Sequence, residues 1–232
     1  MIGGSMTSRN LAIIVPVLNE VNAIHDLINH LKPYAERGNE VLFVDGGSQD
    51  GTAAAIQSAG GKVITSAAGR AKQMNAGARS TSSQYLAFLH ADTRLPSNAD
   101  HIMVALLSQK TLAWGRFDVK IEGQSRLLPI IAFMMNWRSR LTHIATGDQV
   151  LFMSRSLFEI VGCFPDQPLM EDIEISKRLK QCAPPYCVKH KVTTSGRRWD
   201  SRGSWKTIAL MWKLRWSYWR GESPETLAEQ YR

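Results

Sequence analysis

His90 and Asp92, two residues apart at the end of an apolar run, are side chains that could hold a metal ion. The alternation of an extended chain puts both on the same side. Together they could bind a divalent cation against a diphosphate, and the imidazole favours Mn²⁺ because Mg²⁺ prefers all-oxygen ligands. The alternative is that His90 hydrogen-bonds a neighbour while Asp92 caps the following turn.

Glu171 and Asp172 are carboxylates at the expected start of a helix, within the sequence PLMEDIEISKRL at 168–179. The helix dipole favours acidic residues at this end, so capping alone explains the pair. A carboxylate exposed there by the preceding Pro-containing loop is also well placed to accept a proton from a hydroxyl. A carboxylate of this pair is therefore a candidate general base.

Arg70 and Lys72 stand beside Gln73 and Asn75 near the start of a helix that we expect from Gly69 to about Ser80. The helix dipole and the guanidinium both favour a phosphate at such a position. A solvated basic turn is the alternative.

Gly46 and Gly47 follow Asp45 and let the backbone approach a ligand closely, while Ser48 adds a short polar side chain. A plain strand-to-helix turn is the alternative.

The elements that must position these groups alternate between strand and helix, as in a doubly wound sheet. Short apolar runs are typical of parallel strands covered on both faces, and ligands bind outside the carboxyl ends of such strands. Asn19, Glu20 and Asp45 follow the first two runs and would line that crevice, and Ser48 would cap a helix ending at Ala59. The runs are Leu11–Val17, Val41–Val44, Lys62–Thr65 and Tyr85–Leu89.

The pattern becomes irregular in the second half of the chain. After Pro96 we expect a helix to about Gln109 and a strand over Ala113–Ile121, and later a turn before a strand over Val150–Met153. That turn is either an ordinary reversal or a loop that shapes the pocket of a second substrate. Its residues are Gly147, Asp148 and Gln149.

The length and the 44% apolar content fit a single α/β domain. The three cysteines lack metal-ligand spacing and cannot all pair, which predicts reduced thiols in the cytoplasm rather than a secreted disulfide framework. The residues before Met6 are interpreted as an expression remnant, and no apolar segment has the length of a membrane-spanning helix.

The net charge of +8 is concentrated near the end, where residues 177–232 hold 13 Lys or Arg against 4 Asp or Glu. Trp205, Trp212, Trp216 and Trp219 alternate there with basic residues, which predicts a basic, aromatic-rich amphipathic helix. Such a segment could attract phosphate, anionic lipid or nucleic acid, or form a solvated face. The acidic groups at the predicted crevice argue against nucleic acid, because they would repel its phosphates.

With PVLNE, VDGGSQDGT, HAD and MED in this order and at these separations, the chain resembles the family 2 glycosyltransferases over nearly all of residues 11–200. Within that family it is most similar to a small soluble branch that carries FLHADT, TSGRRW and a PETLAEQY-like tail. That branch is associated with radical-enzyme gene neighbourhoods and proposed arsenosugar biosynthesis.

The resemblance implies an α/β protein of the GT-A type, with a Rossmann-like, mostly parallel sheet flanked by helices. The implied organisation is a remnant or disordered start at 1–6 and one glycosyltransferase domain at 7–232. That domain divides into a nucleotide-binding half at 7–95, an irregular acceptor-binding half at 96–200 and basic aromatic C-terminal helices at 201–232.

The implied activity is inverting transfer of a sugar from a nucleotide-sugar donor, with uridine favoured, to an acceptor hydroxyl. The acceptor is a small molecule or, as an alternative, a lipid phosphate at the membrane surface. A basic nucleic-acid-binding module and a sugar-nucleotide binder without activity are the remaining alternatives. The expected location is cytoplasmic, with peripheral contact at the inner membrane face and pairing of two copies through the last helix as further alternatives.

By the same resemblance, Asp172 acts as the general base with Glu171 beside it, and Asp45 accepts a hydrogen bond from the base of the nucleotide. Asp92 matches the final aspartate of the family's metal motif, whereas His90 replaces the usual aspartate, so the implied cofactor is a divalent cation, Mn²⁺ or Mg²⁺. The residues that lie where related enzymes close over the diphosphate are Arg197, Arg198 and Trp199. The residues expected to contact the nucleotide-sugar are Pro16, Val17, Asn19, Glu20, Asp45, Gly46, Ser48, Arg70, Gln73, Asn75, His90, Ala91 and Asp92.

Overall fold

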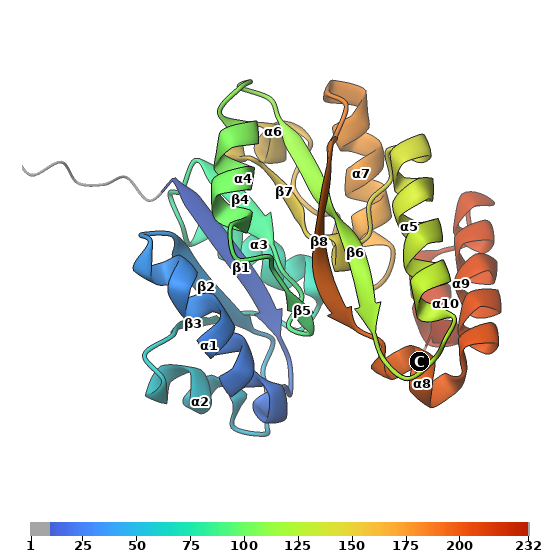
Figure 1. Cartoon of the computed structure of the whole chain (residues 1–232), viewed down its shortest axis with the longest axis horizontal. Helices are drawn as coiled ribbons and strands as arrows, with labels where there is room; N and C mark the ends of the chain where they lie inside the picture. The colour runs from blue at the N-terminus through green and yellow to red at the C-terminus, as the bar shows by residue number, and fades with distance from the viewer. Residues whose placement is uncertain (1–9, 232) are drawn as a thin grey trace, which may run out of the picture.

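The computed structural model describes residues 10–231, so the expected remnant at 1–6 and the start of the expected domain lie outside the described residues (Figure 1). One eight-stranded sheet runs through this part of the chain in the order β3-β2-β1-β4-β7-β6-β8-β5. Helices cover it, and the sheet curls, which confirms the expected α/β fold. The strands are β1 Leu11–Val17, β2 Glu40–Asp45, β3 Lys62–Thr65, β4 Tyr85–Phe88, β5 Thr93–Arg94, β6 Trp114–Glu122, β7 Leu151–Ser154 and β8 Tyr186–Ser195.

The first half is a parallel sheet because its strands bury both faces. Every residue of β1 is buried, and β1 pairs in parallel with β2 and β4. Alternate β1 side chains enter two cores, so that Ile13 packs with the core under α1 (Val21–Glu36) and Ile14 with the core under α3 (Arg70–Arg79). Helix α3 can lie close to the sheet because Gly77 has no side chain. A Cβ at this position would be only 2.4 Å from Ile14 Cγ2.

The helix after β2 begins later than the sequence predicts. Ser48 does not cap it: α2 spans Thr52–Ser58, and its N-cap residue is Gly51, which has a φ of +91° and provides no side-chain cap. Ser48 instead donates to the Asp45 carboxylate, while Asp50 accepts from the backbone N–H groups of Val21 and Thr52 at 3.0 Å. Residues 45–52 therefore form a loop whose acidic side chains bond its own backbone and that of Val21.

The second half departs from the parallel pattern, as expected. Strand β7 runs antiparallel to both β4 and β6, and β8 returns parallel to β6. The short β5 joins the edge through Thr93, which pairs with Thr194 of β8. The elements in this region are α4 Ala99–Leu107, α5 Leu128–Thr142, the 3₁₀ turn η1 Gly147–Gln149, α6 Arg155–Ile160 and α7 Glu171–Cys182.

Three helices end the described chain: α8 Arg197–Arg202, α9 Ser204–Trp219 and α10 Pro224–Tyr231. Leu214 of α9 and Leu227 of α10 are fully buried and pack with Ile173 near the start of α7. The C-terminal helices are thereby fixed beside the Glu171–Asp172 pair. Within residues 10–231, no helix combines the length and apolarity needed to cross a membrane.

Gln73 of α3 joins the two central strands where they end. Its side-chain amide donates at 2.8 Å to the carbonyl oxygens of Val17 and Val44, the neighbouring ends of β1 and β2. The side chain is buried, with 4% of the residue's surface exposed. Gln73 therefore bonds backbone oxygens that would otherwise lose a buried partner.

We expect Gln73→Ala to lower the free energy of unfolding by roughly 1–3 kcal/mol, because it removes one partner of buried hydrogen bonds. Urea unfolding followed by tryptophan fluorescence measures the change. Lys72→Ala on the same helix is the control, since its side chain is 47% exposed. Equal losses in the two variants would contradict the structural role of Gln73.

Candidate active site

The crevice at the carboxyl ends of β1, β2 and β4 is bordered by two loops that are bonded to each other. The N–H of Asn19 donates to Ser48 Oγ at 2.9 Å, and Asn19 Oδ1 accepts from the N–H of Gln49 at 2.9 Å. The N–H of Glu20 donates to Thr52 Oγ1 at 2.9 Å. These reciprocal bonds hold Asn19 at φ +54°, a left-handed conformation that Asn tolerates better than most residues.

Asp45 lies at the floor of this crevice, and its own loop already uses its carboxylate. One oxygen accepts from the N–H groups of Gly47 and Ser48, both at 3.0 Å, and the other from Ser48 Oγ. The residue is 3% exposed. Gly46 packs against Gln73, since an added Cβ would lie 3.0 Å from the Gln73 carboxamide carbon.

Four residues expected at the nucleotide have side chains that the structure places elsewhere. Pro16 and Val17 are buried within β1, so they border the crevice only through the end of their strand. Gln73 bonds strand carbonyls, and Asn75 exchanges two hydrogen bonds with the backbone of Phe164, at 2.8 and 3.1 Å. Short polar residues on a helix could be read from sequence as ligand contacts, but here their amides satisfy buried backbone groups.

His90, Asp92 and Asp148 form a cluster whose potential metal-ligand atoms all lie within 4.8 Å of one another. His90 Nδ1 lies 3.4 Å from Asp148 Oδ1. One imidazole and two carboxylates suit Mn²⁺ or a similar divalent cation, so these residues fit the expected cofactor. The sequence did not reveal Asp148 as a ligand, because only the fold brings it to His90.

The turn η1 creates this cluster. Its Gly147 packs directly beneath His90, where an added Cβ would lie 2.1 Å from the imidazole Cε1. Gln149 is fully buried and donates to Asn136 and Ser139 of α5, so it supports the turn rather than lining the crevice. Val150 closes the turn at φ +54°, a strained conformation for a β-branched residue.

Asp172 is held at the start of α7 by backbone donors. Its Oδ2 accepts from the N–H of Gly147 at 2.9 Å, and its Oδ1 accepts from its neighbour Ile173 N–H at 2.7 Å. Asp172 is half-buried, whereas Glu171 is 3% exposed. The carboxylate of Asp172 thus bonds Gly147, the residue before Asp148. We call His90, Asp92 and Asp148 the metal-type cluster.

Glu171 faces Arg70 of α3, with Oε1 3.4 Å from Nη1. Burial, together with the charge of Asp172, raises the pKa of Glu171. Desolvation opposes the charge of Arg70, but Glu171, Asp148 and Asp172 raise its pKa. Arg70 therefore remains a cation among acidic groups, where it can also meet a diphosphate.

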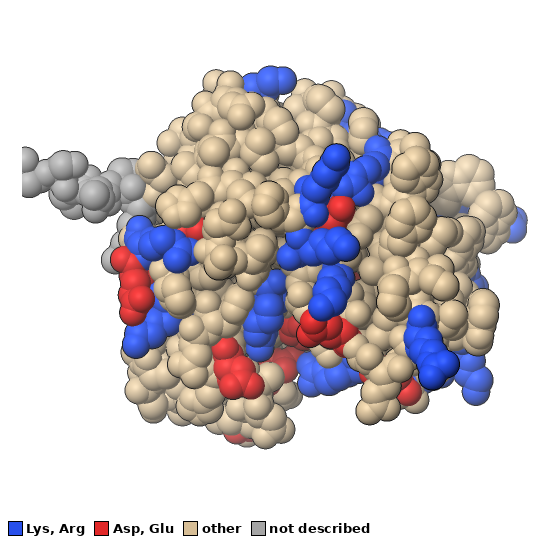
Figure 2. Space-filling model, in the orientation of Figure 1, with Lys and Arg blue, Asp and Glu red and all other residues tan. Residues whose placement is uncertain are grey.

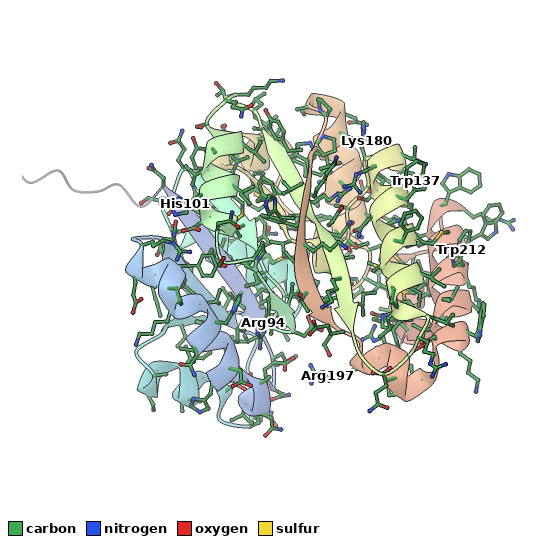
Figure 3. All side chains as sticks on the ribbon, viewed as in Figure 1. Arg94, His101, Trp137, Lys180, Arg197 and Trp212 are labelled. Carbon is green, nitrogen blue, oxygen red and sulfur yellow. The ribbon has the colours of Figure 1, made fainter. Side chains whose placement is uncertain are left out.

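Helix α8 places its residues over the crevice. Arg197, labelled in Figure 3, lies with Nη2 3.9 Å from the Glu20 carboxylate. The guanidinium of Arg198 stacks on Tyr231 of α10, 4.1 Å from the ring centre. Trp199 packs partly buried against the main core, so the tip of this helix is anchored while its two arginines face solvent.

The charge of the crevice is mixed. Desolvation opposes ionisation of Asp148, but the hydrogen bond and charge of His90, with Arg70 and Arg198, lower the pKa of that carboxyl. Burial raises the pKa of Glu20. Figure 2 shows Lys and Arg gathered over β6 and β8, where Lys120, Lys189 and Lys191 are exposed.

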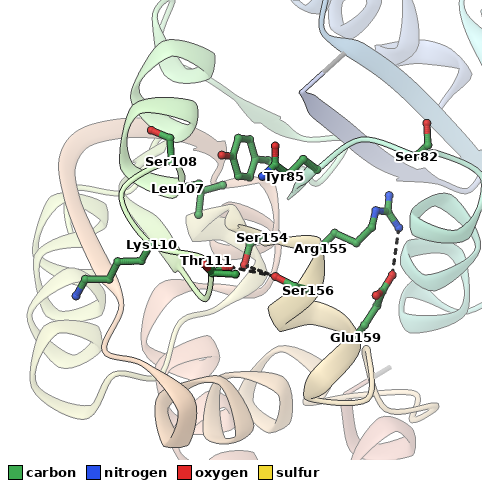
Figure 4. Close-up of a pocket in the computed structure, with 11 residues that line it drawn as sticks. Ser82, Tyr85, Leu107, Ser108, Lys110, Thr111, Ser154, Arg155, Ser156 and Glu159 are labelled. Carbon is green, nitrogen blue, oxygen red and sulfur yellow. Dashed lines mark hydrogen bonds and ion pairs between the residues drawn. The ribbon is translucent and has the colours of Figure 1, made fainter. Parts of the chain in front are cut away.

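A hollow of about 580 Å³ lies at the opposite ends of the strands, near the amino end of β4 (Figure 4). Tyr85, Ser154 and Ser156 line it, and Arg155 lies 3.8 Å from Glu159. Ligands of open α/β sheets bind at the other edge. The carboxyl edge, with the metal-type cluster, is therefore the candidate site.

The mostly parallel curled sheet flanked by helices matches the GT-A fold of known glycosyltransferase structures. Residues 12–160 match Glycosyl transferase family 2, and the chain belongs to that family. This match identifies the family and not the expected arsenosugar branch within it. No curated protein sequence matches the chain.

Solved structures agree with the fold at low sequence identity. TarS of S. aureus, in complex with UDP-GlcNAc, is 15% identical with a TM-score of 0.63, covering 80% of this chain and 58% of TarS. The mannosyltransferase PcManGT of Pyrobaculum calidifontis, with GDP-Man and Mn²⁺, is 17% identical with a TM-score of 0.66, covering 97% and 70%. Glucosyl-3-phosphoglycerate synthase of Mycobacterium tuberculosis, with Mn²⁺ and UDP-Glc, is 18% identical with a TM-score of 0.58, covering 80% and 70%. The chain thus spans less than two thirds of the TarS chain it resembles.

We expect Asp148→Asn to weaken Mn²⁺ binding by on the order of tenfold or more, because even supporting residues of metal sites cost 10–100-fold when changed. Electron paramagnetic resonance of free Mn²⁺ measures the affinity. Asp166→Asn is the matched control, since its side chain is 70% exposed. Unchanged affinity in Asp148→Asn would exclude Asp148 as a ligand.

Proposed function

We propose that the protein is an inverting glycosyltransferase that moves a sugar from a nucleotide-sugar donor to an acceptor hydroxyl by direct displacement. The observation that carries this proposal is the hydrogen bond from Gly147 N–H to Asp172, 2.9 Å long. It joins a fixed carboxylate to the turn that carries Asp148, a member of the metal-type cluster. A proton acceptor and a site for donor charge therefore lie on two sides of one turn.

The reaction requires a base on one side of the sugar and positive charge on the other. The acceptor oxygen forms a bond to the anomeric carbon while the bond from that carbon to the diphosphate breaks. The nucleoside diphosphate leaves with the bonding electron pair, and Asp172 takes the acceptor proton. A divalent cation held by His90, Asp92 and Asp148 would stabilise negative charge on the diphosphate.

The protein's own cations complement this charge. Arg70 lies beside Glu171, and Arg197 and Arg198 project from α8 above the crevice. Asn19, Glu20 and Asp45 line the adjoining loops, where the nucleoside would bind. Glu171, with its raised pKa, would modulate the charge near Asp172 rather than act as the base.

The favoured donor is a UDP-sugar, a choice that rests on the family resemblance. Structures similar to this chain were solved with UDP-GlcNAc, GDP-Man and UDP-Glc, so both nucleosides must be tested. The proposed location is cytoplasmic, and the proposed organisation remains a nucleotide half, an acceptor half and C-terminal helices. The arsenosugar branch supplies one class of acceptors to screen.

We expect UDP or GDP to bind in a metal-dependent manner, and Asp92→Ala to abolish that dependence. Calorimetric titration of each nucleotide with Mn²⁺, with Mg²⁺ and with EDTA measures it. Asp172→Asn should retain nucleotide binding but lower turnover by about 10²–10⁴-fold, the range for general base catalysis, in a screen that follows release of the nucleoside diphosphate. Small and equal losses in both variants would contradict these roles.

A second candidate places the acceptor at a membrane surface. Four tryptophans of α9 are 59–73% exposed, and Phe133 and Trp137 of α5 are 64% and 55% exposed. Trp137 and Trp212 project outward on the same side of the molecule (Figure 3). Exposed basic residues of α9, such as Lys206 and Lys213, complement an anionic bilayer, and Trp residues favour its interface.

Under this second candidate, Trp212→Ala should reduce sedimentation with vesicles that contain anionic lipid, because it removes exposed aromatic surface. The control is Lys110→Ala, an exposed residue beside the hollow near the amino end of β4, far from the aromatic face. Failure of the wild type to sediment, with a dimer seen by analytical ultracentrifugation, would assign the aromatic face to a second copy of the chain.

A further inference from the structure

Arg138 of α5 is a half-buried cation that forms no ion pair among the described residues. Its Nε and Nη2 atoms are buried and have no hydrogen bond within residues 10–231. Desolvation, together with repulsion from Arg215 and Arg116, lowers the pKa of Arg138 to about 9. It is still protonated at neutral pH, and a buried charge is costly unless it is paired.

Arg215 of α9 has the same character. It is half-buried, and no ion pair or hydrogen bond of its side chain occurs among the described residues. Burial lowers its pKa, while the charges of Asp172 and Asp148 act in the opposite direction. Leu214, next to Arg215, packs with Ile173, next to Asp172, and the charge of Asp172 acts on both Arg138 and Arg215.

The other buried or half-buried arginines in the described part of the chain all have partners. Arg140 lies 2.7 Å from Asp118, which also pairs with Arg116, and Arg178 lies 3.4 Å from Glu174. Arg94 and Arg155 donate to backbone carbonyl oxygens. Each of these arginines thus has at least one ion pair or hydrogen bond, although Arg116 Nε is unbonded, and the exceptions are Arg138 and Arg215.

Backbone groups, and neither of these arginines, bond Asp172. Both of its oxygens accept backbone N–H groups, from Gly147 at 2.9 Å and from Ile173 at 2.7 Å. It forms no ion pair with either arginine, although its charge acts on both. The two cations therefore act on Asp172 through their charge without being bonded to it.

We propose that the acceptor carries an anionic group, a phosphate or a carboxylate, and that Arg138 and Arg215 bind this group while the acceptor hydroxyl meets Asp172. Two guanidinium groups can bind such oxygens with directed, charge-assisted hydrogen bonds. The bound anion would neutralise the two cations and orient the attacking oxygen. This proposal rests on the proposed glycosyltransferase function and names its acceptor class.

The test uses inorganic phosphate as the probe, titrated calorimetrically in the presence of UDP and Mg²⁺ so that the donor site is filled. We expect Arg138→Gln and Arg215→Gln each to weaken phosphate binding at least tenfold. Arg126→Gln makes the same charge change at an exposed position and should bind phosphate like the wild type. Phosphate binding that is absent from the wild type, or equal in all four proteins, would overturn the proposal.

Thermal unfolding separates a binding role from a structural one. In phosphate-free buffer, Arg138→Gln should melt no lower than the wild type, because it removes a buried charge that has no partner. Phosphate should raise the melting temperature of the wild type and of Arg126→Gln but not of Arg138→Gln. A much lower melting temperature of Arg138→Gln, with its phosphate response retained, would show that the arginine is structural.

Vesicles of phosphatidylcholine with and without phosphatidate identify the source of the anion. Phosphatidate-dependent binding that is lost in Arg138→Gln would assign the group to a lipid headgroup. Loss of phosphate binding alone would assign it to a soluble acceptor, and both outcomes support the subsite. If the wild type binds phosphate through Arg138 but binds neither UDP nor GDP with any metal, the glycosyltransferase function fails while the anion site stands.

Discussion

The hydrogen bond between the Gly147 amide and Asp172 is the constraint on which the site depends. Gly147 can make it only because the absence of a side chain lets the turn lie against His90. The same placement brings Asp148 to within 3.4 Å of His90. The two proposed roles of base and metal ligand, and the support of the His90 ring, thus depend on one turn of the backbone. A shift of that turn would disturb all three together.

Much of the fold could be predicted from the sequence because its signals are local. The β-branched apolar run Leu11–Val17 is a strand with every residue buried, and Lys62–Thr65 is a strand with the expected bounds. A strand that is buried on both faces has a nearly continuous run of apolar residues, and this run can be recognised in the sequence. The helix after Asp45 was predicted to begin three residues too early because Ser48 has a second possible partner, the Asp45 carboxylate. Local propensity cannot decide between a cap and a loop bond.

The site was less predictable because its residues interact over long distances in sequence. Gln73 and Asn75 look like ligand contacts, yet their amides bond backbone groups of β1, β2 and Phe164. Asp148 looks like a turn residue, yet it faces His90. The cation pair of Arg138 and Arg215 lies on two helices whose packing no spacing rule encodes. Sequence patterns identify the elements and their polar ends, whereas the partners of polar side chains depend on the tertiary structure.

The position of β5 has a consequence for how the protein is made. This two-residue strand follows Asp92 and joins the sheet only through β8, where Thr93 bonds Thr194, 101 positions later in the chain. Chains emerge from the ribosome with the N-terminal part first, and contacts of such long sequence separation form slowly. Asp92 is therefore fixed only after β8 has docked. A nascent chain would therefore hold a complete parallel half-sheet well before the cluster of His90, Asp92 and Asp148 is assembled.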